Sequence, residues 1–141
     1  MLKKKSTKLA KRIKKAFGIP VFDGPRILWP MDNGPAFPPG TTSVDVSGYI
    51  TFYVANSDDV HLDGFILNPL PGQGPPGVTQ PVVDSSGWNW DGGQVSGLRD
   101  GNQVVVVASL PRYPGTVEDA VYFRIATAHA GKKASKNSRR A

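Results

Sequence analysis

The stretch from Trp88 to Ala108 constrains the fold of this chain more than any other. Val104–Val107 places four β-branched residues in succession, and such side chains fit a pleated strand far better than a helix. The Asp-Gly-Asn sequence at 100–102 is a strong turn signal, because Gly and Asn accept a positive φ at little cost. We therefore predict a strand near 94–98, a sharp turn, and a strand near 103–109. An apolar strand of this kind needs partner strands on both edges and a covering layer, so the flanking chain must supply further strands.

Alternation of apolar and polar residues predicts another long strand over residues 43–54. Val44, Val46 and Ile50 share one parity, and Gly48 is a natural point for a break in the strand. The other expected strands are Leu62–Asn68, a short edge strand at Val82 and Val83, and a closing strand over Ala120–Thr127.

Two proline-rich stretches separate or precede these strands. Residues 69–81 contain too many prolines to pair at the centre of a sheet. Residues 20–41 are either a Pro/Gly-rich linker or carry a first edge strand at 26–29, with Trp29 and Phe37 available to dock on the domain. About seven short strands with turn signals between them and no crossover helix predict an all-β fold, an antiparallel β-sandwich.

The charge of the chain is strongly segregated. The formal net charge is +6 over 141 residues, yet residues 21–130 hold four arginines and all eleven acidic residues, a net charge of −7. The remaining thirteen Lys and Arg residues lie in two terminal segments that contain no acid. These are Lys3, Lys4, Lys5, Lys8, Lys11, Arg12, Lys14, Lys15, Lys132, Lys133, Lys136, Arg139 and Arg140.

This segregation divides the chain into an acidic domain between two basic arms. Residues 1–19 are predicted to be a basic amphipathic helical arm, 42–128 the sandwich, and 129–141 a basic, disordered tail. The predicted apolar face of the N-terminal helix consists of Leu2, Leu9, Ile13 and Phe17. No long apolar run follows the basic start, so we expect neither a secretory signal nor a transmembrane segment, and a virion or cytoplasmic assembly is the favoured location.

Three motifs resemble the immunoglobulin-like (Ig-like) domains of bacterial surface proteins and phage structural proteins. They are the Ala-x-x-Asp-Asp-x turn at Ala55–Val60, the aromatic segment Trp88–Asp91 ahead of the turn at Ser96–Gly101, and the alternating strand Gln103–Ala108. The resemblance covers about residues 42–127 and implies an Ig-like sandwich. The chain departs from the family pattern after its long strand, where LPRYPGTVEDA replaces the usual Asp-x-x-Gly-Asn turn.

Calcium binding is one candidate activity, through Asp58, Asp59 and Asp63, joined by Asp84 or Asp91 from another loop. The spacing does not match the alternating acids of a calcium loop, and Asp in turns commonly accepts hydrogen bonds from its own backbone. We therefore expect no metal and no cofactor.

Carbohydrate binding is a second candidate. Trp88 and Trp90 share a parity and would point to one face of their strand, where with Tyr113 they could stack on sugar rings. The alternative is that at least one of them anchors the core.

Catalysis has little support in the sequence. The absence of cysteine excludes thiolate metal sites, Cys nucleophiles and disulfides. His61 and His129 are too few and too far apart for a metal site, and no hydrolase or zinc-peptidase motif is present.

The basic arms suggest three kinds of partner. They could dock the domain onto a larger protein assembly, neutralise the phosphates of nucleic acid, or lie on an anionic membrane surface. Attraction between the arms of one copy and the acidic domain of another uses both halves of the charge segregation. We therefore predict a non-enzymatic structural or interaction protein of a virion or surface-layer type, with nucleic-acid association and carbohydrate binding as the alternatives.

Overall fold

The computed structural model describes residues 23–128. The basic arms, including the apolar face predicted for Leu2, Leu9, Ile13 and Phe17, lie outside these residues, so the predictions for them stay predictions. Every named element between residues 23 and 128 is a strand. The strands are β1 (Pro25–Trp29), β2 (Ser43–Ile50), β3 (His61–Ile66), β4 (Gly77–Thr79), β5 (Val82–Val83), β6 (Asn89–Ser96), β7 (Gln103–Ser109) and β8 (Asp119–Arg124).

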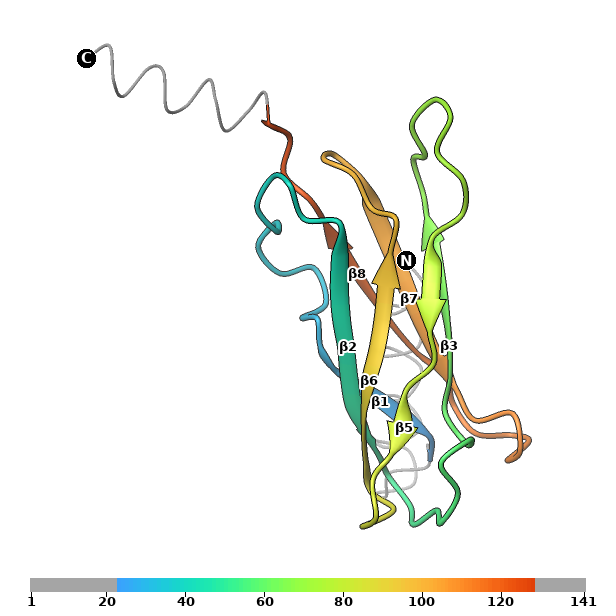
Figure 1. Cartoon of the computed structure of the whole chain (residues 1–141). Helices are drawn as coiled ribbons and strands as arrows, with labels where there is room; N and C mark the ends of the chain where they lie inside the picture. The colour runs from blue at the N-terminus through green and yellow to red at the C-terminus, as the bar shows by residue number, and fades with distance from the viewer. Residues whose placement is uncertain (1–22, 129–141) are drawn as a thin grey trace, which may run out of the picture.

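The strands form two antiparallel sheets, in the arrangement of a β-sandwich (Figure 1). One sheet has the order β1-β2-β6-β4, with β5 also paired to β6, and the other has the order β3-β7-β8. Figure 1 shows β2, β6 and β5 in front of β7 and β8. For residues 23–128 this confirms the prediction of an all-β fold with two antiparallel sheets.

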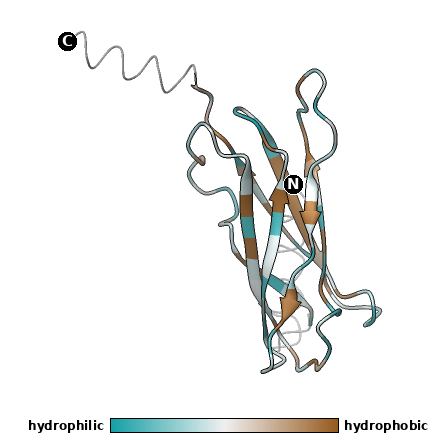
Figure 2. Cartoon of the chain, viewed as in Figure 1, coloured by the Kyte–Doolittle hydropathy of each residue, from teal (hydrophilic) through white to brown (hydrophobic). Residues whose placement is uncertain are grey.

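The alternation predicted for the long strand β2 is confirmed. Val44, Val46 and Ile50 are buried, and hydrophobic and hydrophilic bands alternate along β2 in Figure 2. The register with β6 shifts between Val46 and Gly48. Any side chain at Gly48 would collide with the carbonyl of Arg26 and the ring of Trp90, so glycine is required where the strand breaks its regular pairing.

The apolar strand β7 has a partner on each edge, as its sequence predicts: β3 on one side and β8 on the other. The turn before it is present, with Gly97 and Gly101 at positive φ. This turn does not close a hairpin, because β6 and β7 belong to different sheets. The chain crosses between the layers here, and Leu98, only 1% exposed, fills the end of the core beneath the crossing.

The proline-rich segments take up edge positions. β4 lies within 69–81 and pairs only with β6, so the prediction that this stretch does not pair centrally is confirmed. The first edge strand expected at 26–29 is present as β1.

The segment 30–41 packs against the sandwich through Phe37, which docks on the domain as expected from the sequence. Phe37 forms a parallel bridge with Ile125, and its ring packs edge-on against Phe123 at 5.4 Å between centroids. The free edge of β8 is thus covered by the segment that follows β1. The aromatic contact explains why a stretch so rich in Pro and Gly does not remain a linker.

Candidate functional site

The two tryptophans predicted to share a face lie in different environments. Trp90 is 1% exposed and its indole N–H donates to the carbonyl of Tyr49 at 3.0 Å, whereas Trp88 is 45% exposed. Trp90 lies in the core cluster, as the alternative of a core anchor predicts. Trp88 precedes β6, and its backbone carbonyl accepts from the N–H of Ile50.

Tyr113 does not complete a glycan platform either. Its ring packs edge-on against Phe52, with 5.2 Å between centroids, and its hydroxyl donates to a carboxylate oxygen of Asp59 at 3.1 Å. The ring that lies beside Trp88 is Tyr53, at 6.0 Å between centroids, and both side chains are exposed. One aromatic pair is therefore available at this end of the sandwich in place of the predicted trio.

The three carboxylates proposed for calcium are not brought together. Asp59 is fully buried, with Oδ1 3.4 Å from a guanidinium nitrogen of Arg112 and Oδ2 bonded to Tyr113. Asp58 lies exposed in a turn where its backbone N–H donates to the side chain of Asn56, and Asp63 lies on β3. Among residues 23–128 no three His, Asp or Glu side chains are placed to share a metal ion.

The buried carboxylate of Asp59 acts on its neighbour. Partial burial of the Tyr113 ring, together with the hydrogen bond to Asp59 and its negative charge, raises the pKa of Tyr113 above its usual value. The arrangement ties the loop after β7 to the turn before β3. We call this contact the carboxylate lock. It has a structural role, because the carboxylate of Asp59 is shielded from solvent.

The other acidic candidates are turn or strand residues. Asp84 accepts hydrogen bonds from the hydroxyl and the backbone N–H of Ser86, and mainly the hydroxyl lowers the pKa of Asp84. Asp91 is an exposed residue of β6. Both fit the general behaviour of Asp at turns and strand surfaces.

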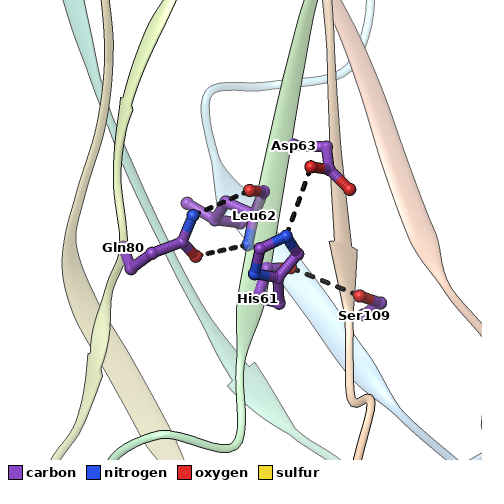
Figure 3. A network of polar contacts seen from close by, with 5 residues as sticks. All are labelled: His61, Leu62, Asp63, Gln80 and Ser109. Atoms are coloured by element: carbon purple, nitrogen blue, oxygen red, sulfur yellow. Dashed lines mark hydrogen bonds and ion pairs between the residues drawn. The ribbon is translucent and has the colours of Figure 1, made fainter.

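A polar network on β3 combines residue types used in hydrolases (Figure 3). The imidazole Nε2 of His61 lies 3.2 Å from a carboxylate oxygen of Asp63, and Ser109 lies opposite on β7. The hydroxyl of Ser109 donates to the backbone carbonyl of His61 at 3.5 Å, away from the ring. A nucleophile must be hydrogen-bonded to its base, so this geometry does not form a catalytic triad.

The same network contains a structural clamp that sequence reasoning missed. The side-chain amide of Gln80 accepts from the backbone N–H of Leu62 at 2.7 Å and donates to its carbonyl at 3.0 Å, as Figure 3 shows. Gln80 lies between β4 and β5, so it joins the two sheets where β3 has no further strand. A glutamine between two short edge strands gives no recognisable sequence signal.

A cavity of about 360 Å³ lies beside β3. It is lined mainly by Phe65, Ile66 and the prolines at 69, 75 and 76. Gln73 supplies the side-chain amide of the lining, and that amide is engaged with Asn102. The lining offers no charged group that could orient a substrate.

The two ends of the described chain lie at opposite ends of the sandwich. The carbonyl of Asp23 accepts from the backbone N–H of Val117, just ahead of β8. The last residues follow β8 past Ile125, whose carbonyl accepts from Gly101 in the turn that precedes β7. The two basic arms therefore attach to opposite ends of an acidic domain.

No helix among the described residues is long and apolar enough to cross a membrane. No protein-family model matches the chain, and no curated protein or solved structure is significantly similar to it.

Proposed function

We propose that this chain is a non-enzymatic structural or interaction protein, an Ig-like module that its basic arms attach to a larger assembly of the virion or surface-layer type. The observation that carries the proposal is the attachment of the arms at opposite ends of a domain with a net charge of −7. A module with a cationic segment at each end can bridge two acidic neighbours, including two further copies of itself.

The Ig-like part of the proposal is supported by the order of the strands. In an Ig domain of the constant type, strands A, B, E and D form one sheet and strands C, F and G the other. When β4 and β5, which both pair with β6, are counted together as strand D, β1-β2-β6-β4 corresponds to A-B-E-D and β3-β7-β8 to C-F-G. A fold of this class does not by itself define a function.

Light scattering after size exclusion tests self-assembly. The full chain is compared with a variant in which Lys3, Lys4, Lys5 and Lys8 become glutamine, and with a control in which the same four become arginine. We expect the full chain and the arginine control to exceed the monomer mass at low salt and to dissociate at high salt, because exposed charges are screened. The glutamine variant should be smaller than both at low salt and equal to them at high salt. Monomers in all three samples would overturn assembly through neighbouring copies.

Association with nucleic acid is a second candidate, favoured by the thirteen cationic residues of the arms. Binding to DNA of arbitrary sequence would then weaken steeply with salt. The glutamine variant would show a smaller salt dependence, and retention of assembly without DNA binding would exclude this alternative.

A further inference from the structure

The outer face of the three-stranded sheet carries a continuous apolar strip. Val104 and Val106 are fully buried in the core, so Val105 and Val107 point outward on the other side of β7. Phe65 of β3 and Tyr122 of β8 are in register with Val105, and Phe65 is 51% exposed.

Further residues extend this strip at both ends. Ala120 is in register with Val107, but only 8% of its surface is exposed. Leu67 follows β3, is 55% exposed, and donates its backbone N–H to Gln103. We call the six residues Phe65, Leu67, Val105, Val107, Ala120 and Tyr122 the apolar strip.

The central strands of the other sheet are mostly polar on their outer face, where Asp45, Ser47, Asp91 and Gln94 lie. The exposed apolar side chains of that sheet include Leu28 on the edge strand β1 and Val82 on the short strand β5. A solvated face of an antiparallel sheet is normally polar, whereas a strand that is apolar on both faces is typical of a strand covered on both faces. The apolar strip thus has the composition of a covered surface.

We propose that residues 2–17 of the same chain cover the apolar strip, with Leu2, Leu9, Ile13 and Phe17 against the sheet. The strip runs from Leu67, which pairs with Gln103, to Val107, so it covers four residue steps of β7, about 14 Å. In a helix, Leu9, Ile13 and Phe17 would extend over about 12 Å, which is close to the length of the strip.

The position of Asp23 permits this contact within one chain. Its carbonyl accepts from Val117, two residues before β8, so the arm joins the domain at one end of the sheet that carries the strip. The six residue steps from Phe17 to Asp23 can span about 20 Å when extended, which is enough to turn back along the sheet.

Charge favours the same placement. An exposed carboxylate flanks the apolar strip on each side: Asp63 on β3, and Asp32, whose Oδ1 accepts from the backbone N–H of Tyr122. Lysines beside the apolar stripe of a helix would lie above them. Arg124 is the basic residue of this face, and it lies at the far end, where a guanidinium nitrogen donates to the carbonyl of Gly34.

This placement deepens the proposed function by locating its contact surface. With the apolar side of the arm on the sheet, the remaining lysines form a basic outer layer over the three-stranded sheet. The inference concerns only the apolar side of the arm, whereas assembly depends on its basic side. In the full chain, absence of the contact with the sheet while assembly is present would contradict this inference. Absence of assembly while the contact is present would contradict the proposed function.

Paramagnetic NMR on the full chain tests the contact, because the chain has no cysteine and accepts a single label. A spin label on Thr7→Cys should strongly broaden the methyl signals of Val105 and Val107. It should leave Val82 sharp, a valine that is 55% exposed on β5 of the other sheet. Equal broadening of all three valines, or broadening of none, would overturn the proposal.

Further samples test whether the apolar side of the arm makes the contact, and whether the contact lies within one chain or between copies. Leu9→Ser/Ile13→Ser should abolish the broadening of Val105 and Val107, whereas the matched control Lys11→Ser/Lys15→Ser should keep most of it. Persistence of the signal in the first variant would refute contact through the apolar side. In a mixture of spin-labelled chain with isotope-labelled chain lacking the spin label, broadening of Val105 would instead show contact between copies and overturn the contact within one chain.

Discussion

The two ends of the sandwich are each held by a fully buried polar side chain, and the two differ in charge. Asp59 locks the end at which the described chain begins, and Asn102 locks the end at which it finishes. The first is a carboxylate held by Tyr113 and Arg112. The second is an amide held by another amide and the backbone, so only the first end should respond to salt and to pH.

The amide lock is satisfied within the protein. Asn102 Oδ1 accepts from the backbone N–H of Arg99 and from the side chain of Gln73, both at 2.7 Å, and Asn102 donates back to Gln73 at 3.1 Å. Gln73 also donates to the carbonyl of Gly97. The carboxylate lock instead relies on Arg112, whose side chain is 56% exposed. Asp59 and Asn102 are equally buried, but water has access to Arg112, the ionic partner of Asp59.

The largest effect is expected at the amide lock. Asn102→Ala should lower the free energy of unfolding by about 3 kcal/mol, because it removes the hydrogen bond from the N–H of Arg99 and both hydrogen bonds exchanged with Gln73. The matched change at the other end, Asn56→Ala, removes one bond to the backbone of Asp58 and should cost about 1 kcal/mol. Urea unfolding measures both. Equal losses would contradict the view that Asn102 anchors its end.

The next effect is expected at the carboxylate lock. Asp59→Asn preserves the size of the side chain and an oxygen that can accept from Tyr113, but it removes the ion pair with Arg112. The loss should be about 1.5 kcal/mol at low salt and smaller at high salt, because Arg112 is partly solvated.

Salt provides the control for this second prediction. The loss caused by Asn102→Ala should be the same at both ionic strengths, since no ion pair is involved. A salt-independent loss for Asp59→Asn would show that the Arg112 contact contributes little, and the contrast between the two ends would then rest on Tyr113 alone.

The strands could be predicted from the sequence, but the buried polar contacts of Asp59 and Asn102 could not. Period-two alternation placed β2, and four successive β-branched residues placed β7, because burial of alternate side chains is a local property of a strand. Asn102 was recognised only as a turn residue. Its pairing with Gln73 joins segments 29 residues apart and leaves no periodic trace.

Burial of individual side chains shows the same limit within short segments. Trp88 and Trp90 share a parity, yet Trp88, which precedes β6, is 45% exposed and Trp90 is 1% exposed. The carboxylates of Asp58 and Asp59 are adjacent in sequence, yet one is exposed and the other buried. Tertiary contacts made by Tyr113 and Arg112 decide this difference.

The third prediction concerns alkaline pH and only the carboxylate lock. The pKa of Tyr113 is raised in the folded chain, so its contribution to stability is complete below the unfolded value of about 10 and is lost as pH rises through the folded value. Tyr113 should therefore ionise above its usual pKa in a titration followed by phenolate absorbance. Tyr113→Phe identifies its signal.

The matched variants sharpen this titration. Asp59→Asn removes the negative charge beside the phenol, so it should move the ionisation of Tyr113 to lower pH, although partial burial of the ring remains. Gln73→Ala at the other end should leave it unchanged. A shift of the same size in both variants would mean that general loosening of the sandwich, and not the carboxylate, controls the phenol.

The smallest effect is expected beside the carboxylate lock, in the turn between β5 and β6. The Ser86 hydroxyl is the main cause of the lowered pKa of Asp84, so Ser86→Ala should move that pKa up toward the ordinary value of about 3.9. A lowered folded pKa contributes stability above the unfolded value and loses it as pH falls. The variant should therefore lose less stability on acidification than the parent chain. Carboxyl carbon NMR follows Asp84 directly, with Ser85→Ala as the neighbouring control. If Asp84 titrates alike in both variants, the backbone N–H groups stabilise its carboxylate and the Ser86 hydroxyl does not. This turn would then resemble the end of the sandwich at Asn102, where no hydrogen bond between side chains involves a charged group.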